Sequence, residues 1–74
     1  MRVTVIVQAS SESDILNLIV FPEYGGKRFN ASVVLSEAIA ADGGQILKGY
    51  TPGDQFQVEF ERNPDRITRV IGKK

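Results

Sequence analysis

The amino-acid sequence predicts an all-β fold with one short helix, arranged as a five-stranded barrel, and three observations lead to this prediction. Apolar and polar residues alternate with the two-residue period of β-strands in several short segments. Turn sequences containing glycine or proline separate most of these segments. One stretch is instead rich in residues that favour helices. A chain of 74 residues is long enough for one small domain, so we expect residues 1–74 to form a single unit.

The first two expected strands are joined by a loop rich in serine and acidic residues. Residues 2–8 place a valine at every second position from Val3, which indicates a half-buried strand. Residues 9–14 have the serine and aspartate content of a turn. Apolar residues are nearly continuous from 15 to 21, and the β-branched residues among them favour a second strand that ends at Pro22.

A hairpin, a third strand and the helix follow. The Gly-Gly pair at 25–26 accepts the positive φ angles of a tight connection. Residues 28–34 alternate again, with Phe29 at the first inward position. Residues 35–42 are rich in helix formers, and the glycines at 43–44 predict the end of a helix.

The last part of the chain predicts a final hairpin. Residues 51–54 and 62–65 have turn compositions, and the strictly alternating residues 55–61 lie between them. Residues 66–71 form the fifth expected strand, and their apolar side chains break the two-residue period, which indicates a β-bulge. Residues 45–50 predict no definite element.

A three-strand meander, a helix and a hairpin fit an OB-like Greek-key barrel, the fold named for oligonucleotide and oligosaccharide binding. Closure of the sheet removes exposed strand edges, and a helix between the third and fourth strands is typical of this barrel. An SH3-like barrel is the nearest alternative, although it usually lacks a helix at this position.

Several motifs lie in the expected turns and core. They are Pro-Glu-Tyr-Gly-Gly-Lys at 22–27, Ala-Ala-Asp-Gly-Gly at 40–44, and Leu-Lys-Gly-Tyr-Thr-Pro-Gly-Asp at 47–54 followed by Phe56, Val58 and Phe60. Over about residues 15–72 the chain resembles cold-shock domains. The resemblance implies an OB fold that binds single-stranded nucleic acid on its first three strands. Where that family presents aromatic rings and a histidine, this sequence has Asn17, Ile19, Asn30 and Ser32.

The composition excludes several kinds of chemistry. The chain has no cysteine, histidine or tryptophan, so it has neither thiol nor imidazole groups for catalysis or metal binding. The close carboxylate pairs, Glu12 with Asp14 and Glu59 with Glu61, fall in a loop and on an exposed strand face. We therefore expect no enzyme, no catalytic residue, no cofactor and no metal site.

Charge is balanced in total but uneven along the chain. Residues 1–61 hold four cations and eight anions, a net charge of −4, whereas residues 62–74 hold five cations and one anion, a net charge of +4. Cations that keep an edge strand soluble explain this pattern, and phosphate contact is the alternative. The apolar runs are too short for a membrane span of about 20 residues. With no signal peptide in the sequence, we expect a cytoplasmic protein without membrane contact.

Strand alternation defines an outer face on the first three strands. It comprises Arg2, Thr4, Ile6, Gln8, Ile15, Asn17, Ile19, Phe21, Arg28, Asn30 and Ser32. We expect a non-enzymatic module that binds single-stranded RNA or DNA weakly or non-specifically. The expected contacts are Arg2, Asn17, Ile19, Phe21, Tyr24, Lys27, Arg28 and Asn30. For Tyr24 and for Tyr50, local packing is expected ahead of stacking on a base.

The alternative function is protein interaction or self-association. Ile6, Ile19 and Phe21 form an apolar patch on the outer face, which a solvated sheet normally avoids. Either the helix, a loop or the chain's tail covers this patch, or a partner does.

Overall fold

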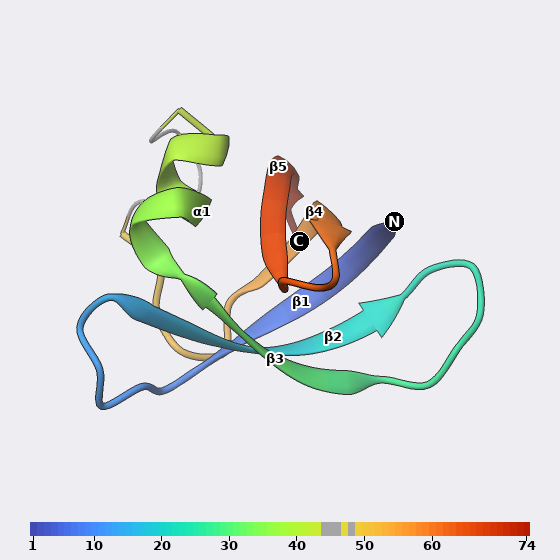
Figure 1. Ribbon diagram of the computed structural model, residues 1–74, viewed down its shortest axis with the longest axis horizontal. Coiled ribbons are helices and arrows are strands. Elements are labelled where there is room, and N and C mark those ends of the chain that lie inside the picture. The colour runs from blue at the N-terminus through green and yellow to red at the C-terminus, as the bar shows by residue number, and fades with distance from the viewer. Residues whose placement is uncertain (44–46, 48) are drawn as a thin grey trace.

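The computed structural model describes residues 1–43, 47 and 49–74, and it is built mainly of β-strands (Figure 1). Its elements are β1 (Arg2–Gln8), β2 (Ile15–Pro22), β3 (Phe29–Val34), α1 (Leu35–Ala41), β4 (Gln55–Glu61) and β5 (Arg66–Lys73). The five strands form one antiparallel sheet in the order β3-β2-β1-β4-β5. The predicted β-rich fold with one short helix is confirmed for the described residues.

The predicted element boundaries are close to those observed. β1 and β4 have the predicted bounds, β2 ends at Pro22, and β3 begins one residue later than expected. β5 continues two residues further, to Lys73. Helix α1 ends at Ala41, and the φ of 65° at Gly43 suits the left-handed conformation that often follows a helix. Gly44 and residues 45, 46 and 48 of the undefined segment 45–50 lie outside the described residues.

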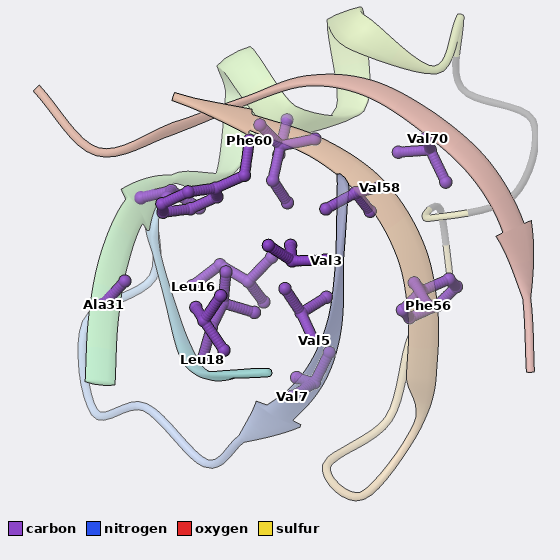
Figure 2. Packing of buried hydrophobic residues seen from close by; sticks show 14 of the residues in the cluster. Val3, Val5, Val7, Leu16, Leu18, Ala31, Phe56, Val58, Phe60 and Val70 are labelled. Carbon is purple, nitrogen blue, oxygen red and sulfur yellow. The ribbon is translucent and has the colours of Figure 1, made fainter. Parts of the chain in front are cut away.

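The core occupies the concave side of the curved sheet, as Figure 2 shows. Every second side chain of β1, β2 and β4 is buried there, as the alternation predicts. Full burial of a valine, leucine or phenylalanine stabilises the fold by about 1.5–3 kcal/mol each, so this cluster determines which face of each strand points inward. Its members are Val3, Val5, Val7, Leu16, Leu18, Val20, Ala31, Val33, Ala38, Leu47, Phe56, Val58, Phe60, Ile67 and Val70.

The predicted β-bulge in the fifth strand is also confirmed. Ile67 pairs with Phe60, whereas Arg69 pairs with the preceding residue, Glu59, so Thr68 is an extra residue in β5. This insertion shifts by one position which residues of the strand point toward the core. Ile67 and Val70 are therefore both buried although they are three residues apart.

Side chains of β4 and of the turn after it contact β3 across the open side of the sheet. The rings of Phe29 in β3 and Phe60 in β4 have centroids 5.9 Å apart, and the guanidinium of Arg62 lies 4.0 Å from the centroid of Phe29. Helix α1 packs against both β3 and β5. No strand pairing joins β3 to β5 within the described residues, so the sheet is curved but not closed.

Candidate nucleic-acid interface

The strand register determines which side chains lie next to each other on the outer face. Ile6 of β1 pairs with Ile19 of β2, and Ile19 pairs with Asn30 of β3. Gln55 of β4 pairs with Ile6 on its other side. These residues form one row across the sheet, in which both isoleucines are half-buried. The predicted apolar patch is therefore a narrow band between amide side chains.

A shallow depression of about 480 Å³ lies beside this row. It is lined by Gln8, Asn17, Leu18, Ile19, Asn30, Ala31, Ser32 and Asp65. Its polar side chains are three amides and one hydroxyl, from Gln8, Asn17, Asn30 and Ser32, and the carboxylate of Asp65, which comes from the turn between β4 and β5. We call this depression the amide groove. It combines three predicted contacts, Asn17, Ile19 and Asn30, with residues that we had not selected.

Hydrogen bonds fix one amide in the groove and leave another free. The Ser32 hydroxyl donates to Asn17 Oδ1 at 2.8 Å, and Asn17 Nδ2 donates to the carbonyl of Ala9 at 3.3 Å. Asn30 is exposed, and its side chain has no hydrogen-bond partner among the described residues. Asn17 is thus oriented by its neighbours, whereas both ends of the Asn30 amide are available to a ligand.

The loop between β2 and β3 presents an exposed aromatic ring between the ends of two strands. Tyr24 is 84% exposed. Lys27 and Arg28 follow it, are exposed, and form no ion pair within the described chain. Gly25 and Gly26 have φ angles of 97° and 108°, as predicted for this turn. The expectation that Tyr24 packs locally is wrong, because its side chain is largely exposed. The loop that carries it extends beyond the curved sheet (Figure 1).

Tyr50 differs from Tyr24 in its surroundings. It is half-buried and packs against the core. The expectation of local packing is therefore confirmed for Tyr50.

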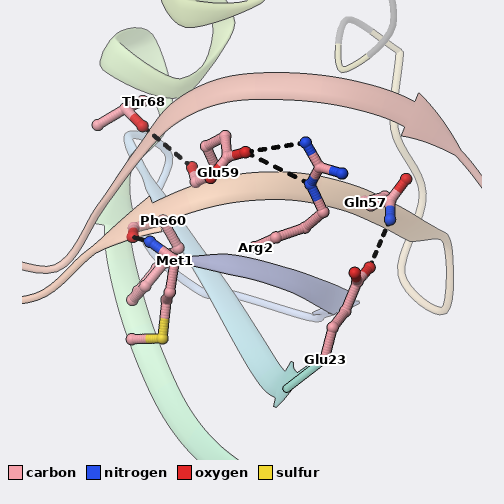
Figure 3. Close-up of polar contacts among 7 residues, drawn as sticks. All are labelled: Met1, Arg2, Glu23, Gln57, Glu59, Phe60 and Thr68. Carbon is pink, nitrogen blue, oxygen red and sulfur yellow. Dashed lines mark hydrogen bonds and ion pairs between the residues drawn. The ribbon is translucent and has the colours of Figure 1, made fainter.

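Arg2 lies in an ion pair at a distance from the amide groove. Its guanidinium approaches Glu59 Oε1 at 3.2 Å across the β1–β4 pairing (Figure 3). Two residues before Glu59 in β4, the side-chain amide of Gln57 donates a hydrogen bond to the carboxylate of Glu23 in the β2–β3 loop. Of the eight predicted contacts, Arg2 is the one already occupied by a carboxylate.

Ion pairs also account for most cations of the basic C-terminal segment. Arg62 approaches Asp65 at 3.6 Å, Arg66 approaches Glu61 at 3.0 Å, and Lys73 approaches Asp54 at 3.5 Å. These pairs argue against the alternative that the C-terminal cations form one phosphate-binding patch.

Lys74 is the C-terminal cation that reaches the outer face. Its Nζ donates to the Thr4 hydroxyl at 2.7 Å, and Thr4 pairs with Phe21 in the sheet. Phe21, a predicted contact, is half-buried at this position. No periodicity in the sequence indicates that the Lys74 side chain crosses β4 to reach β1.

The structure offers few groups for metal binding or acid–base chemistry. Within the described residues, no three acidic side chains gather closely enough to hold a metal ion. Glu59 and Glu61, one of the close carboxylate pairs, contact Arg2 and Arg66 respectively. The described helix is also too short and too polar to cross a membrane.

Comparison with protein-family models, with curated proteins and with solved structures finds no match. The likeness to cold-shock domains therefore remains a hypothesis based on the turn and core motifs.

Proposed function

We propose that this protein is a non-enzymatic module with an OB-like Greek-key barrel that binds single-stranded RNA or DNA weakly and without strong base preference. The observation that carries the proposal is Tyr24. It is 84% exposed and lies in one loop with Lys27 and Arg28, two cations without an acidic partner in the described chain.

The strand order supports the barrel. Pairing of β3 with β5 would close the observed order β3-β2-β1-β4-β5 into a five-stranded barrel. β3 and β5 already lie near each other, and the Phe29–Phe60 ring contact joins β3 to the neighbouring strand β4. OB folds bind oligonucleotides on the face of strands 2 and 3 and on the loops that follow strands 1 and 4. The amide groove has the same components: β2, β3, the end of β1 and the β4–β5 turn.

The chemistry of the face fits a flexible, anionic ligand with planar bases. Stacking of one base on an aromatic ring contributes roughly 1–3 kcal/mol. Lys27 and Arg28 are available to phosphates, and the amides of Asn17 and Asn30 present donors and acceptors to base edges. With a single fully available ring, the expected affinity is low.

Charge indicates how the strand lies on the face. Glu12 and Asp14 occupy the β1–β2 loop, so phosphates are disfavoured at that end. Lys27, Arg28 and Lys74 supply cations toward the other end. Neutralisation of three phosphates on a single strand gives a slope of log K against log salt concentration of about −2.

Fluorescence anisotropy with labelled, random-sequence single strands of RNA and of DNA tests the proposal. We expect saturable binding that weakens as salt is added. Tyr24→Ala should reduce the affinity about 5- to 150-fold, the equivalent of one lost stack, whereas Tyr24→Phe should retain most of it. Because Tyr24 is exposed, neither change should lower the melting temperature.

A matched pair of charge variants separates phosphate contact from general attraction. Arg28→Ala and Arg69→Ala each remove one exposed cation without an ion pair in the described chain. Arg28→Ala should reduce the salt slope by about 0.7, and Arg69→Ala, on β5, should leave it unchanged. Absence of saturable binding below about 100 µM at low salt would rule out the proposed function.

A further inference from the structure

The outer face carries opposite charges at its two ends. The β1–β2 loop contains Glu12 and Asp14 and no cation, a net charge of −2. The β2–β3 loop contains Lys27 and Arg28 with one anion, Glu23, whose carboxylate accepts a hydrogen bond from Gln57, so its net charge is +1. Figure 1 shows these loops at opposite ends of the sheet. Glu12, like both cations, has no side-chain partner in the described part of the chain. Glu12 at one end and Lys27 and Arg28 at the other are therefore available to a partner.

The row that contains Ile6 and Ile19 lies between the two charged loops. Along β2, Ile19 is five residues from Asp14 and four residues from Glu23, the loop residues on either side of the strand. With a strand rise of about 3.3 Å per residue, the two loops begin about 17 Å and about 13 Å from the row. Asn30 and Gln55 extend the same row onto the neighbouring strands.

This arrangement is self-complementary under a two-fold rotation. If the axis lies between two facing sheets and runs along the row, the strands of the second copy run in the opposite direction. The acidic loop of each copy then faces the basic loop of the other. An axis parallel to the strands would instead bring loops of like charge together, which is unfavourable.

We propose that a second copy of this chain docks on the outer face, with the two-fold axis along the Ile6–Ile19 row. Each isoleucine then contacts the same isoleucine of the second copy, and this contact removes the half-buried apolar band from water. Asn30 and Gln55 also meet their counterparts, and a pair of amides can satisfy each other's donors and acceptors. In such an isologous contact, every interaction away from the axis occurs twice.

Charge complementarity favours a second copy over an unrelated protein as the occupant. The net charge of the chain is zero, so two copies approach without overall repulsion. The β1–β2 loop, with a net charge of −2, faces the partner's β2–β3 loop, with a net charge of +1. A second copy and a nucleic-acid strand would cover the same face and exclude one another, but this inference does not depend on nucleic-acid binding.

Sedimentation equilibrium without nucleic acid, at concentrations up to the millimolar range, tests the dimer. We expect a reversible monomer–dimer equilibrium at low salt with no larger species, because a two-fold contact is closed. Raising the ionic strength to 1 M, where the Debye length is about 3 Å, should weaken it. A monomer at all concentrations, or a series of larger oligomers, would overturn the proposal.

Charge reversal tests the orientation of the two copies. Glu12→Lys alone and Lys27→Glu alone each replace attraction by repulsion at two symmetric places, so each should weaken dimerisation about tenfold. The double variant again pairs opposite charges and has the net charge of the natural chain. Its dimerisation should return to within about threefold of the natural level. A double variant as weak as the single variants would contradict the proposed axis.

The apolar centre has its own test. Ile19→Asp should abolish the dimer, while Thr68→Asp, at an exposed position of β5, introduces the same charge elsewhere and should not. Circular dichroism and thermal unfolding check that each variant is folded. If Ile19→Asp does not fold, the charge-reversal series still decides, because Glu12 and Lys27 are exposed loop residues.

Discussion

The contact between Arg62 and Phe29 predicts a measurable coupling across the open side of the sheet. The guanidinium lies 4.0 Å from the ring centroid, and the Arg62 side chain is 50% exposed. An exposed cation–π contact contributes about 0.5–1 kcal/mol. The half-exposed ion pair to Asp65 contributes about 0.2–1 kcal/mol. Arg62→Gln should therefore lower the free energy of unfolding by about 1 kcal/mol and the melting temperature by about 4–8 °C.

A double-mutant cycle isolates the shared interaction. Phe29→Leu removes the cation–π contact and also the ring contact with Phe60, which is worth about 0.5–1.5 kcal/mol. Arg62→Gln removes the ion pair with Asp65, and Phe29→Leu removes the ring contact with Phe60. Each of these losses belongs to one substitution only, so it cancels in the coupling energy. The coupling energy between Arg62→Gln and Phe29→Leu should therefore equal the cation–π contribution, about 0.5–1 kcal/mol.

Urea denaturation of the four proteins measures this energy, with Arg69→Gln in place of Arg62→Gln as the control. Arg69 is an exposed cation with no ring contact within the described chain, so it should show no coupling to Phe29. A coupling of zero for Arg62 as well would show that the β4–β5 turn does not rest on β3 in solution. The position of Asp65 beside the amide groove would then also be in doubt.

Three further predictions concern stability. The pKa of Asp54 is lowered, chiefly by the hydrogen bond from the backbone N–H of Thr51, so its stabilising effect is present above the ordinary pKa of 3.8 and is lost as pH falls through the lowered value. Asp54→Asn should therefore flatten the stability profile in that acidic range. Gly26→Ala should cost about 1 kcal/mol, because the φ of 108° strains any residue with a Cβ. Leu18→Ala should cost about 2–5 kcal/mol and Ile19→Ala, half-exposed on the other face, clearly less. Chemical denaturation measures each difference, over a pH series for Asp54.

Controls make these results specific. Gly72→Ala adds a Cβ at a glycine without positive φ and with no atom within 4 Å, so it should be nearly neutral. If Gly26→Ala were equally neutral, the turn conformation would be wrong. Equal costs for Leu18→Ala and Ile19→Ala would contradict the assigned phase of β2. An acid profile unchanged by Asp54→Asn would mean that other carboxylates dominate acid unfolding.

The sequence predicts strands well where burial is one-sided. In β1 and β4 the two-residue period reflects a core on one face only, so the bounds and the inward residues follow from the pattern. In β5 the apolar pattern indicates a bulge but not its position. The placement of Thr68 as an extra residue depends on pairing with β4, and pairing is not visible along one strand.

The candidate site was harder to predict because it is assembled from distant segments. Asn17 and Asn30 follow from alternation on adjacent strands, whereas Asp65 reaches the groove only because the β4–β5 turn approaches β3. The ion pair of Arg2 joins residues 57 positions apart. Tyr24 was placed in the correct loop, but its exposure depends on how far that loop projects beyond the core.

The position of β1 in the middle of the sheet affects how the chain folds. The β1–β3 meander and the β4–β5 hairpin each form from neighbouring segments, and among the described strands only the β1–β4 pairing joins them. Local hairpins form within microseconds, whereas joining distant segments first requires closing a long loop. We therefore expect the union of these two pieces to limit the folding rate. Since β1 is paired on both sides, its amide hydrogens should exchange only when the whole domain unfolds, later than those on the free edges of β3 and β5.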